Sequence, residues 1–284
     1  RPPRLEDGFR RLPVGLETTV HNYAADYYLL ESEGDADVVF NGQSTTALAG
    51  TEPYSGRHAW WSNRVDDSNS RLTRRFDLRT VTPGEPLELI AQTWWDIESD
   101  YDYGYFVVSR DGEKWDILPG QRTTQENPSG NSFGHAYTGA SRDGDTDPVQ
   151  WVTERYDLSD YAGEEVWLRF EYVTDDAVNR AGWFVDDIAI PALGYASDFE
   201  RGPDGWESEG WLLIDNKLRQ NWLLQVVEFE DNRLTAVRRI PVEEGVASFT
   251  IEDLGAGKTA AIAVSALAPV TTEPAAYTLE IAGN

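Results

Sequence analysis

Short runs in which apolar and polar residues alternate recur along most of the 284-residue chain, separated by turn residues. A period of two places successive side chains on opposite faces of a strand, so these runs predict half-buried β-strands. No stretch of comparable length has helical periodicity, although 158–163 is compatible with one helical turn. The sequence therefore predicts an all-β protein. The expected strands are 27–30, 38–40, 72–78, 87–95, 105–109, 114–118, 151–158, 166–173, 183–190, 222–229, 234–240, 247–251, 259–266 and 276–281.

Turn residues predict how some of these strands connect. An acidic, Gly-containing turn at 33–35 predicts a hairpin between the first two strands, and Asp111-Gly112 predicts a tight two-residue hairpin turn. The segment 119–148 is rich in Gly, Asn, Ser, Asp and Thr and has no periodicity. It predicts a long surface loop, and loops of that length are often functional.

Changes in composition divide the chain into domains. Its first 18 residues are basic, Pro-rich and aperiodic, which predicts a linker. The five strands expected after Pro191 cannot easily close a sandwich alone, and the hairpin at 19–48 supplies the missing strands. We therefore expect two jelly-roll-like β-sandwich domains, one inserted in the other, with one following the other as the alternative. The predicted boundaries are 1–18 for the linker, 19–50 plus 196–284 for a discontinuous domain, and 51–195 for the inserted domain.

Composition narrows the classes of function. The 50 Asp and Glu against 24 Lys and Arg give a formal charge of −26, which opposes binding to nucleic acid or anionic lipid. The negative charge could instead keep the protein soluble, suit a salty habitat or bind cations. The absence of Cys excludes disulfides and thiolate zinc sites. The sequence contains no run of about 18 apolar residues, so it predicts no membrane-spanning helix. Because the sequence has no Met and opens at Arg1, we expect a processed piece of a longer polypeptide.

Two acidic stretches suggest a metal site. If WWDIESDYDYG at 94–104 were extended, four acids would lie on one side of a strand: Asp96, Glu98, Asp100 and Asp102. Neighbouring carboxylates about 7 Å apart repel by roughly 0.6 kcal/mol in water and about 2.4 kcal/mol at an effective dielectric of 20. In AGWFVDDIAIP at 181–191, Asp186-Asp187 places at least one carboxylate in an apolar strand. A calcium ion bridging the two stretches would relieve both costs, because calcium takes 6–8 oxygen ligands.

The same stretches carry a family resemblance. WWDIESDYDYG followed by YFVVSRDGEKW, together with GWFVDDI at 182–188 and DFERGPDGW at 198–206, resembles the region after the catalytic domain of secreted bacterial immune inhibitor A-type metallopeptidases. Residues 51–195 look like their MAM-like jelly roll, and VHNYAADYYLLES at 20–32 is similar to the segment that leads into it. The likeness covers about 19–225.

The resemblance implies structural calcium but no zinc in this chain. Zinc peptidases of that family carry His-Glu-x-x-His, and none of His21, His58 and His135 has a histidine four residues away. By resemblance, the expected calcium ligands include Glu98, Asp102 and Asp187 from the two acidic motifs, with Asp100 and Asp186 as substitutes. Asp176, with Asp175 as its substitute, is the fourth expected ligand, because this pair precedes the strand that carries Asp187 and lies at the same kind of strand end. Asp187 is the strongest candidate. The alternative is that these are solvated loop acids, which we prefer for Asp66-Asp67.

The expected function is a non-catalytic, calcium-stabilised accessory region of a secreted zinc metallopeptidase. Its expected partners are the upstream catalytic domain and protein or glycan substrates. A free-standing carbohydrate-binding or adhesion module is the alternative, because Trp60-Trp61 and Trp94-Trp95 could stack on sugar rings. At most one Trp of each pair can be exposed on a strand, and core packing is the preferred interpretation.

Overall fold

The computed structural model describes residues 5–283. In this range the regular elements are strands and two short 3-10 helices, with no α-helix, so the predicted all-β class is confirmed. The helices among residues 5–283 are each three residues long, so none of them could span a membrane. The chain divides into two compact units: unit 1 is Arg1–Gly50 with Lys217–Asn284, and unit 2 is Thr51–Asn216.

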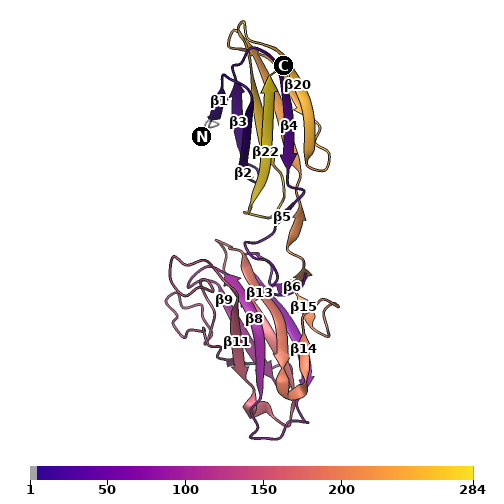
Figure 1. Ribbon diagram of the computed structural model, residues 1–284. Coiled ribbons are helices and arrows are strands. Elements are labelled where there is room, and N and C mark those ends of the chain that lie inside the picture. The colour runs from indigo at the N-terminus through magenta and orange to yellow at the C-terminus, as the bar shows by residue number, and fades with distance from the viewer. Residues whose placement is uncertain (1–4, 284) are drawn as a thin grey trace. The chain divides into compact units, whose positions relative to one another are not determined.

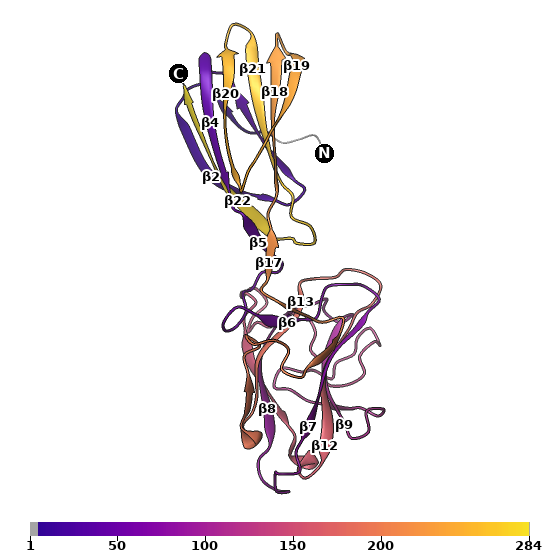
Figure 2. The ribbon, with the colours of Figure 1, turned by 90° about the vertical axis from the view of Figure 1, so that its right-hand side faces the viewer.

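Unit 2 is built from two antiparallel sheets (Figures 1 and 2). One sheet has the order β10-β9-β12-β7-β15, and the other has the order β11-β8-β13-β6-β16, with β14 paired to β13. The elements are β6 Ala59–Trp61, β7 Asn69–Asp77, β8 Glu88–Asp96, β9 Tyr103–Ser109, β10 Asp116–Leu118, β11 Val152–Asp157, η1 Ser159–Tyr161, β12 Glu165–Val173, β13 Gly182–Ile190, η2 Pro191–Leu193, β14 Tyr195–Ser197, β15 Glu207–Glu209 and β16 Leu212–Ile214.

Alternation of side chains builds the core of unit 2. Every second residue of β12 is buried, and Phe170 from this strand packs against Trp183 of β13, with ring centroids 5.7 Å apart. By contrast, β9 is buried along its whole length, because Ala136 of the long loop packs against the outward side chains of this strand. Phe184 is likewise buried on the outer side of β13, where it contacts Trp61 and Trp94.

Unit 1 contains a second pair of sheets, β1-β3-β21-β18-β19 and β2-β22-β4-β20, and a two-stranded ribbon of β5 and β17. Its core includes an aromatic cluster of Phe40, Trp222 and Tyr277. The strands are β1 Leu5–Phe9, β2 Val14–His21, β3 Ala25–Leu30, β4 Gly34–Gly42, β5 Thr45–Ala47, β17 Lys217–Arg219, β18 Trp222–Glu230, β19 Arg233–Ile240, β20 Val246–Leu254, β21 Lys258–Ala266 and β22 Pro274–Gly283.

Two local predictions for unit 1 differ from the structure. The segment expected to be a linker up to residue 18 contains β1 and most of β2, and β2 pairs with β22 along eight residues. The hairpin predicted between 27–30 and 38–40 is wrong. β3 pairs with β1 and β21, whereas β4 pairs with β22 and β20 in the other sheet. Both strands place apolar side chains in the core, including Leu30 and Phe40, so the turn between them carries the chain across the sandwich.

Residues 196–216, which the sequence analysis assigned to the discontinuous domain, pack within unit 2. In this segment β15 pairs with β7, β16 pairs with β6, and Trp206 and Trp211 are buried in the unit 2 core. The hairpin of β9 and β10 forms as expected, but its connection is a six-residue loop, not a two-residue turn. Asp111 shapes this loop, since its Oδ1 accepts hydrogen bonds from the backbone N–H groups of Glu113 and Lys114, each at 2.8 Å.

Candidate metal centre

The first acidic stretch folds as a turn. β8 ends at Asp96 and β9 begins at Tyr103, so the predicted extended row of four acids does not form. Asp100 has φ of +68°, a conformation that Asp tolerates better than most residues. Thr138 fixes the turn: its Oγ1 accepts a hydrogen bond from the Asp100 N–H at 2.7 Å and donates one to the Glu98 carbonyl at 3.2 Å.

Sheet pairing brings a third acid to this turn. Val173, the last residue of β12, lies opposite Tyr103, the first residue of β9. Asp175 therefore follows β12 at the same edge of the sheet at which Asp102 precedes β9. One carboxylate oxygen from each of Glu98, Asp102 and Asp175 lies within 4.8 Å of the other two. We call these three residues the acidic cluster. Within the described part of the chain, no Lys, Arg or His forms an ion pair with any of them.

Asp102 is the buried member of the acidic cluster, with 1% of its surface exposed. Its Oδ2 accepts a hydrogen bond from the Tyr172 hydroxyl at 3.0 Å, and its Oδ1 accepts one from the Asp175 N–H at 3.1 Å. Burial nevertheless raises the pKa of Asp102, because it outweighs the opposing effect of these hydrogen bonds. The charge of Asp175 acts in the same direction as burial.

The donor chemistry of the acidic cluster fits a hard cation. At 4.8 Å, each carboxylate pair repels by about 1 kcal/mol in water and about 3 kcal/mol at an effective dielectric of 20. Three carboxylates with no positive side chain beside them are the kind of ligand that calcium prefers. The cluster contains no histidine or cysteine, so its chemistry is not that of a typical structural zinc site.

The structure brings together two of the four predicted ligands, Glu98 and Asp102. Asp175, predicted as a substitute, joins them, whereas its neighbour Asp176 is exposed and lies outside the acidic cluster. Asp187 also lies elsewhere. Gly182 pairs with Asp96 and Asp186 pairs with Gln92, so Asp187 is more than about 13 Å along β13 from the strand end near Glu98. One ion therefore cannot bridge Glu98 and Asp187.

Asp186 has a separate structural role. It is fully buried, as the apolar sequence around it predicts, and its carboxylate accepts hydrogen bonds from the backbone N–H groups of Ser55 at 3.1 Å and Asp187 at 2.8 Å. Burial raises the pKa of Asp186 to about 7. Asp187 adopts φ of +43° at a bulge in β13, and the Ser55 hydroxyl donates a hydrogen bond to its Oδ1 at 2.8 Å.

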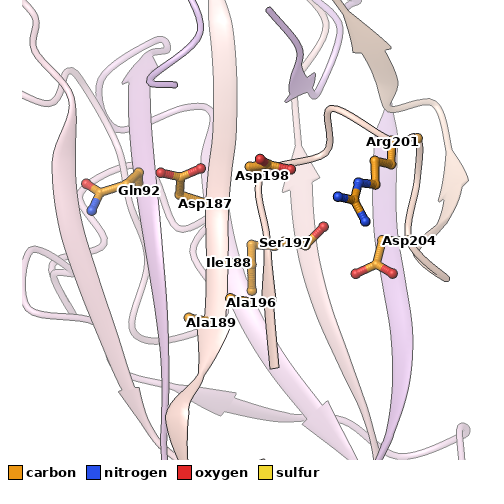
Figure 3. Close-up of a pocket in the computed structure, with 10 residues that line it drawn as sticks. Gln92, Asp187, Ile188, Ala189, Ala196, Ser197, Asp198, Arg201 and Asp204 are labelled. Atoms are coloured by element: carbon orange, nitrogen blue, oxygen red, sulfur yellow. The ribbon is translucent and has the colours of Figure 1, made fainter. Parts of the chain in front are cut away.

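Asp187 lines an open groove of about 750 Å³ in unit 2 (Figure 3). Ile188 on β13 pairs with Ser197, the last residue of β14, so Asp187 and Asp198 both lie next to this pair. Figure 3 shows Gln92 beside Asp187, and Arg201 with Asp204 farther along the groove. The groove thus combines charges of both signs, and its acids are not part of the acidic cluster.

Glu200 is a structural residue that the sequence analysis did not single out. Its Oε1 accepts hydrogen bonds from the backbone N–H groups of Arg57 and His58, both at 2.7 Å. Both hydrogen bonds lower the pKa of Glu200, and the bond from Arg57 has the larger effect. A Cβ at Gly56 (φ +59°) would lie 2.5 Å from the Glu200 Cδ, so the close approach requires glycine. The only signal in the sequence was the position of Glu200 within the DFERGPDGW motif.

Comparison with known proteins identifies the family. The family model described as "Immune inhibitor A-like, MAM domain" matches residues 25–211, which include nearly all of unit 2. The chain belongs to the immune inhibitor A-like MAM domain family. The predicted resemblance is therefore confirmed.

Relatives of this MAM-family chain include peptidases. The Vibrio cholerae pre-pro-metalloprotease PrtV is 33% identical over 147 residues, which are 52% of this chain and 14% of PrtV. Immune inhibitor A of Bacillus thuringiensis subsp. alesti is 28% identical over 61% of this chain and 23% of its own length. Bacillopeptidase F of Bacillus subtilis is 28% identical over 37% of this chain and 6% of its own length. The chain thus spans less than a quarter of each of these relatives.

Among solved structures, dimeric latent PorU from Porphyromonas gingivalis aligns with a TM-score of 0.21 and 14% identity. The alignment covers 85% of this chain and 22% of PorU. A score this low supports no conclusion about either protein.

The tryptophan pairs of the MAM-family chain form part of its interior. Trp60 and Trp95 belong to the unit 2 core, whereas Trp61 and Trp94 pack against Phe184 on the outer side of β13. All four are at most 4% exposed, so they offer no platform for sugar rings. Core packing, the preferred interpretation of these pairs, is confirmed.

Proposed function

We propose that this chain is a non-catalytic, calcium-stabilised accessory region of a secreted zinc metallopeptidase. In that role it supports an upstream catalytic domain and contacts protein substrates outside the active site. Family membership and the two relatives named as a metalloprotease and as immune inhibitor A support this proposal. The sequence contains no His-Glu-x-x-His, so zinc hydrolysis by the usual two-histidine helix would be carried out elsewhere in the parent protein.

The acidic cluster is the observation that carries the calcium part of the proposal. Glu98, Asp102 and Asp175 come from two segments that are more than 70 residues apart in sequence. A calcium ion held by all three would offset their repulsion and fix the β8–β9 turn to the end of β12. Its role would be structural, because it would bind the folded form and not the unfolded chain.

A ligand present at a hundredfold excess over its Kd stabilises the folded state by about 2.7 kcal/mol. For a domain of this size, 1 kcal/mol shifts the melting temperature by roughly 2–4 °C, so calcium should raise it by about 5–10 °C.

Thermal unfolding of the chain in calcium and in excess EDTA tests the calcium site, with magnesium as the control for a general ionic effect. We expect a higher melting temperature in calcium than in either other condition. Equal melting temperatures in calcium and EDTA would contradict the proposal.

The accessory role needs a separate assay. We expect the chain alone, with zinc added, not to hydrolyse casein. We also expect deletion of this region from the parent protein to reduce hydrolysis of folded protein substrates more than hydrolysis of a short peptide. Hydrolysis of casein by the chain alone, or an equal loss on both substrates, would contradict the accessory role.

A further inference from the structure

One sheet of unit 1 has apolar side chains on both of its faces. In β18, Leu224 and Val226 are fully buried in the core, so Leu223, Val227 and Phe229 point outward. Strands β21, β18 and β19 lie side by side in this sheet (Figure 2). An antiparallel strand with one face in water usually alternates between apolar and polar residues. The pattern of β18 is instead typical of a strand that is covered on both sides.

Sheet pairing extends this outer surface over four strands. Val227 lies opposite Val237 of β19 and Ala261 of β21, and Ala261 lies opposite Leu29 of β3. None of these four residues is part of the core of unit 1 that contains Phe40. A second row adds Phe229 and Leu234, which lie opposite each other. We call six outward residues the apolar face: Leu29, Val227, Phe229, Leu234, Val237 and Ala261.

The outer face of the other sheet of unit 1 is polar. In β2, β4, β20 and β22, the outward positions include four acids: Glu17, Asp37, Glu252 and Glu280. By contrast, the outward positions of β3, β18, β19 and β21, all within the described chain, include no Asp or Glu. This contrast is large in a chain with 50 acidic residues. Depletion of charge at an exposed patch is typical of the centre of a protein–protein interface.

The size of the apolar face indicates what kind of partner covers it. Strands lie about 4.8 Å apart and alternate residues about 7 Å apart, so two rows over four strands cover on the order of 300 Å². Apolar patches of about this size are often functional. A stable complex of two separate proteins needs roughly 800 Å² from each partner, so a second copy of this chain is a poor occupant. A tethered domain needs less area, because a short linker gives it an effective concentration of about millimolar.

Strand β1 forms the edge of the same sheet, next to the apolar face. It pairs with β3, and Gly8 of β1 lies opposite Leu29. The proposed function places the catalytic domain before this chain, so that domain would be joined through β1, about 4.8 Å from the nearest strand of the face. This chain covers 14% of PrtV and 23% of immune inhibitor A, so most of each relative lies outside the matched region.

We propose that the upstream catalytic domain docks on the apolar face of unit 1 through an apolar patch of its own. This inference rests on the accessory function proposed above and names the surface that carries it out. Docking removes Leu234 and Val237 from water, and these two side chains are 60% and 53% exposed. Removal of this apolar surface from water is the driving force of the contact. The contact uses no residue of the acidic cluster.

Cysteine labelling tests whether the apolar face is covered in the parent protein. The sequence contains no Cys, so Val237→Cys provides a single thiol in this chain. Val246→Cys is the matched control, because Val246 is 49% exposed and lies on β20 in the other sheet. Both variants are labelled with a maleimide, as the chain alone and within the parent protein, and mass spectrometry of the labelled peptide gives the rate.

We expect Val237→Cys and Val246→Cys to react at similar rates in the chain alone. In the parent protein, only Val237→Cys should react more slowly, by at least about tenfold. Equal rates for Val237→Cys in the chain and in the parent would overturn the docking proposal. Slower reaction at both positions would overturn it as well, because the protection would not be specific to the apolar face. A rate at Val237→Cys that falls as the chain alone is concentrated would assign the face to a second copy.

Casein hydrolysis by the same parent samples separates this proposal from the accessory function. A parent that hydrolyses casein but labels Val237→Cys as fast as the chain alone contradicts only the docking surface. A parent without peptidase activity contradicts the accessory function itself and removes the occupant proposed for the face.

A charge placed in the apolar face tests the contact from the other direction. Here Leu234→Cys reports labelling, and Val237→Glu should speed its reaction in the parent by at least about fivefold, because a buried carboxylate without a partner is costly. Val246→Glu is the control and should leave the rate unchanged. In the chain alone, both Val→Glu substitutions should change the melting temperature by similar, small amounts, because both positions are about half exposed. Unchanged labelling with Val237→Glu would overturn the proposal.

Discussion

The Tyr172 hydroxyl donates a hydrogen bond to the Asp102 Oδ2 at 3.0 Å, and both residues are buried. Tyr172 lies on β12, and Asp102 is the last residue of the turn before β9. This contact holds the buried carboxylate of the acidic cluster in place. Burial, with the charge of Asp102 as the next cause, raises the pKa of Tyr172, so the hydroxyl remains a hydrogen-bond donor at neutral pH.

Tyr172→Phe should destabilise the fold by about 1–3 kcal/mol, because it leaves a buried carboxylate oxygen without its donor. Urea unfolding in EDTA measures this change without a contribution from calcium. Tyr161→Phe is the matched control: its hydroxyl lies 3.4 Å from the exposed Asp116, and we expect a change below about 0.5 kcal/mol. Equal effects of the two substitutions would contradict a special role for the Tyr172–Asp102 contact.

Two Asp→Asn substitutions separate the acidic cluster from the groove at Asp187. Asp102→Asn should abolish the calcium-dependent rise in melting temperature, because it removes the central charge of the cluster. Asp187→Asn should leave that rise unchanged, because Asp187 is far along β13 from Glu98. Calorimetric titration with calcium provides a second measurement. Loss of the calcium response in Asp187→Asn, with the response kept in Asp102→Asn, would move the site to the groove.

The raised pKa of Asp186 should make the stability of the fold depend on pH. Its pKa is about 7 in the folded protein, whereas an unfolded Asp titrates near 3.9. Between these values the folded state binds the extra proton, so this residue makes stability fall as pH rises from about 4 to about 7, by up to roughly 1.4 kcal/mol per pH unit. Above about pH 7 its contribution is constant. Other titrating groups also change the free energy of unfolding with pH. The contribution of Asp186 is therefore isolated by comparing the wild type with the Asp186→Asn variant.

Asp186→Asn should flatten that fall, as measured by urea unfolding in EDTA between about pH 4 and pH 8. Asp116→Asn, at an exposed position, serves as the control and should keep the wild-type slope. The same slope in wild type and in Asp186→Asn would show that Asp186 does not hold a proton in the folded state near neutral pH.

Glu200→Ala should loosen the segment that contains Arg57 and His58, because it removes the acceptor of both backbone N–H groups. Hydrogen exchange of these two amides should become faster. Glu200→Gln keeps an equivalent oxygen and should restore most of the protection. If Glu200→Gln exchanges as fast as Glu200→Ala, the carboxylate charge matters more than the hydrogen bonds.

Strand existence could be predicted from the sequence because alternation is a local property. Segments such as Glu165–Val173 reveal their buried face through every second residue. The choice of partner strand is not local. Tyr27–Leu30 and Val38–Phe40 are each recognisable as strands, yet nothing in either run shows that they belong to opposite sheets. The same limit explains why the sequence assigns Trp206 and Trp211 to the discontinuous domain, although both are buried in the unit 2 core.

The acidic cluster could be predicted only in part for a related reason. Glu98 and Asp102 belong to one motif, so their proximity follows from a single turn. Asp175 and Asp176 are equivalent in the sequence, and only the geometry after β12 selects Asp175. The sequence favours Asp187 because of its apolar surroundings, but the buried carboxylate is that of Asp186, which accepts hydrogen bonds from backbone N–H groups. Tyr172 gave no signal beyond its place in a strand.

The ribbon of β5 and β17 joins the two chain segments of unit 1 that border residues 51–216. Ala47 lies opposite Lys217, so the chain leaves unit 1 and re-enters it at neighbouring positions. Residues 51–216 thus form a cassette whose two attachment points are already side by side. Replacing the whole cassette with a short loop would leave every strand of the host sandwich in its register, which is the arrangement that allows one domain to be exchanged for another within a larger protein.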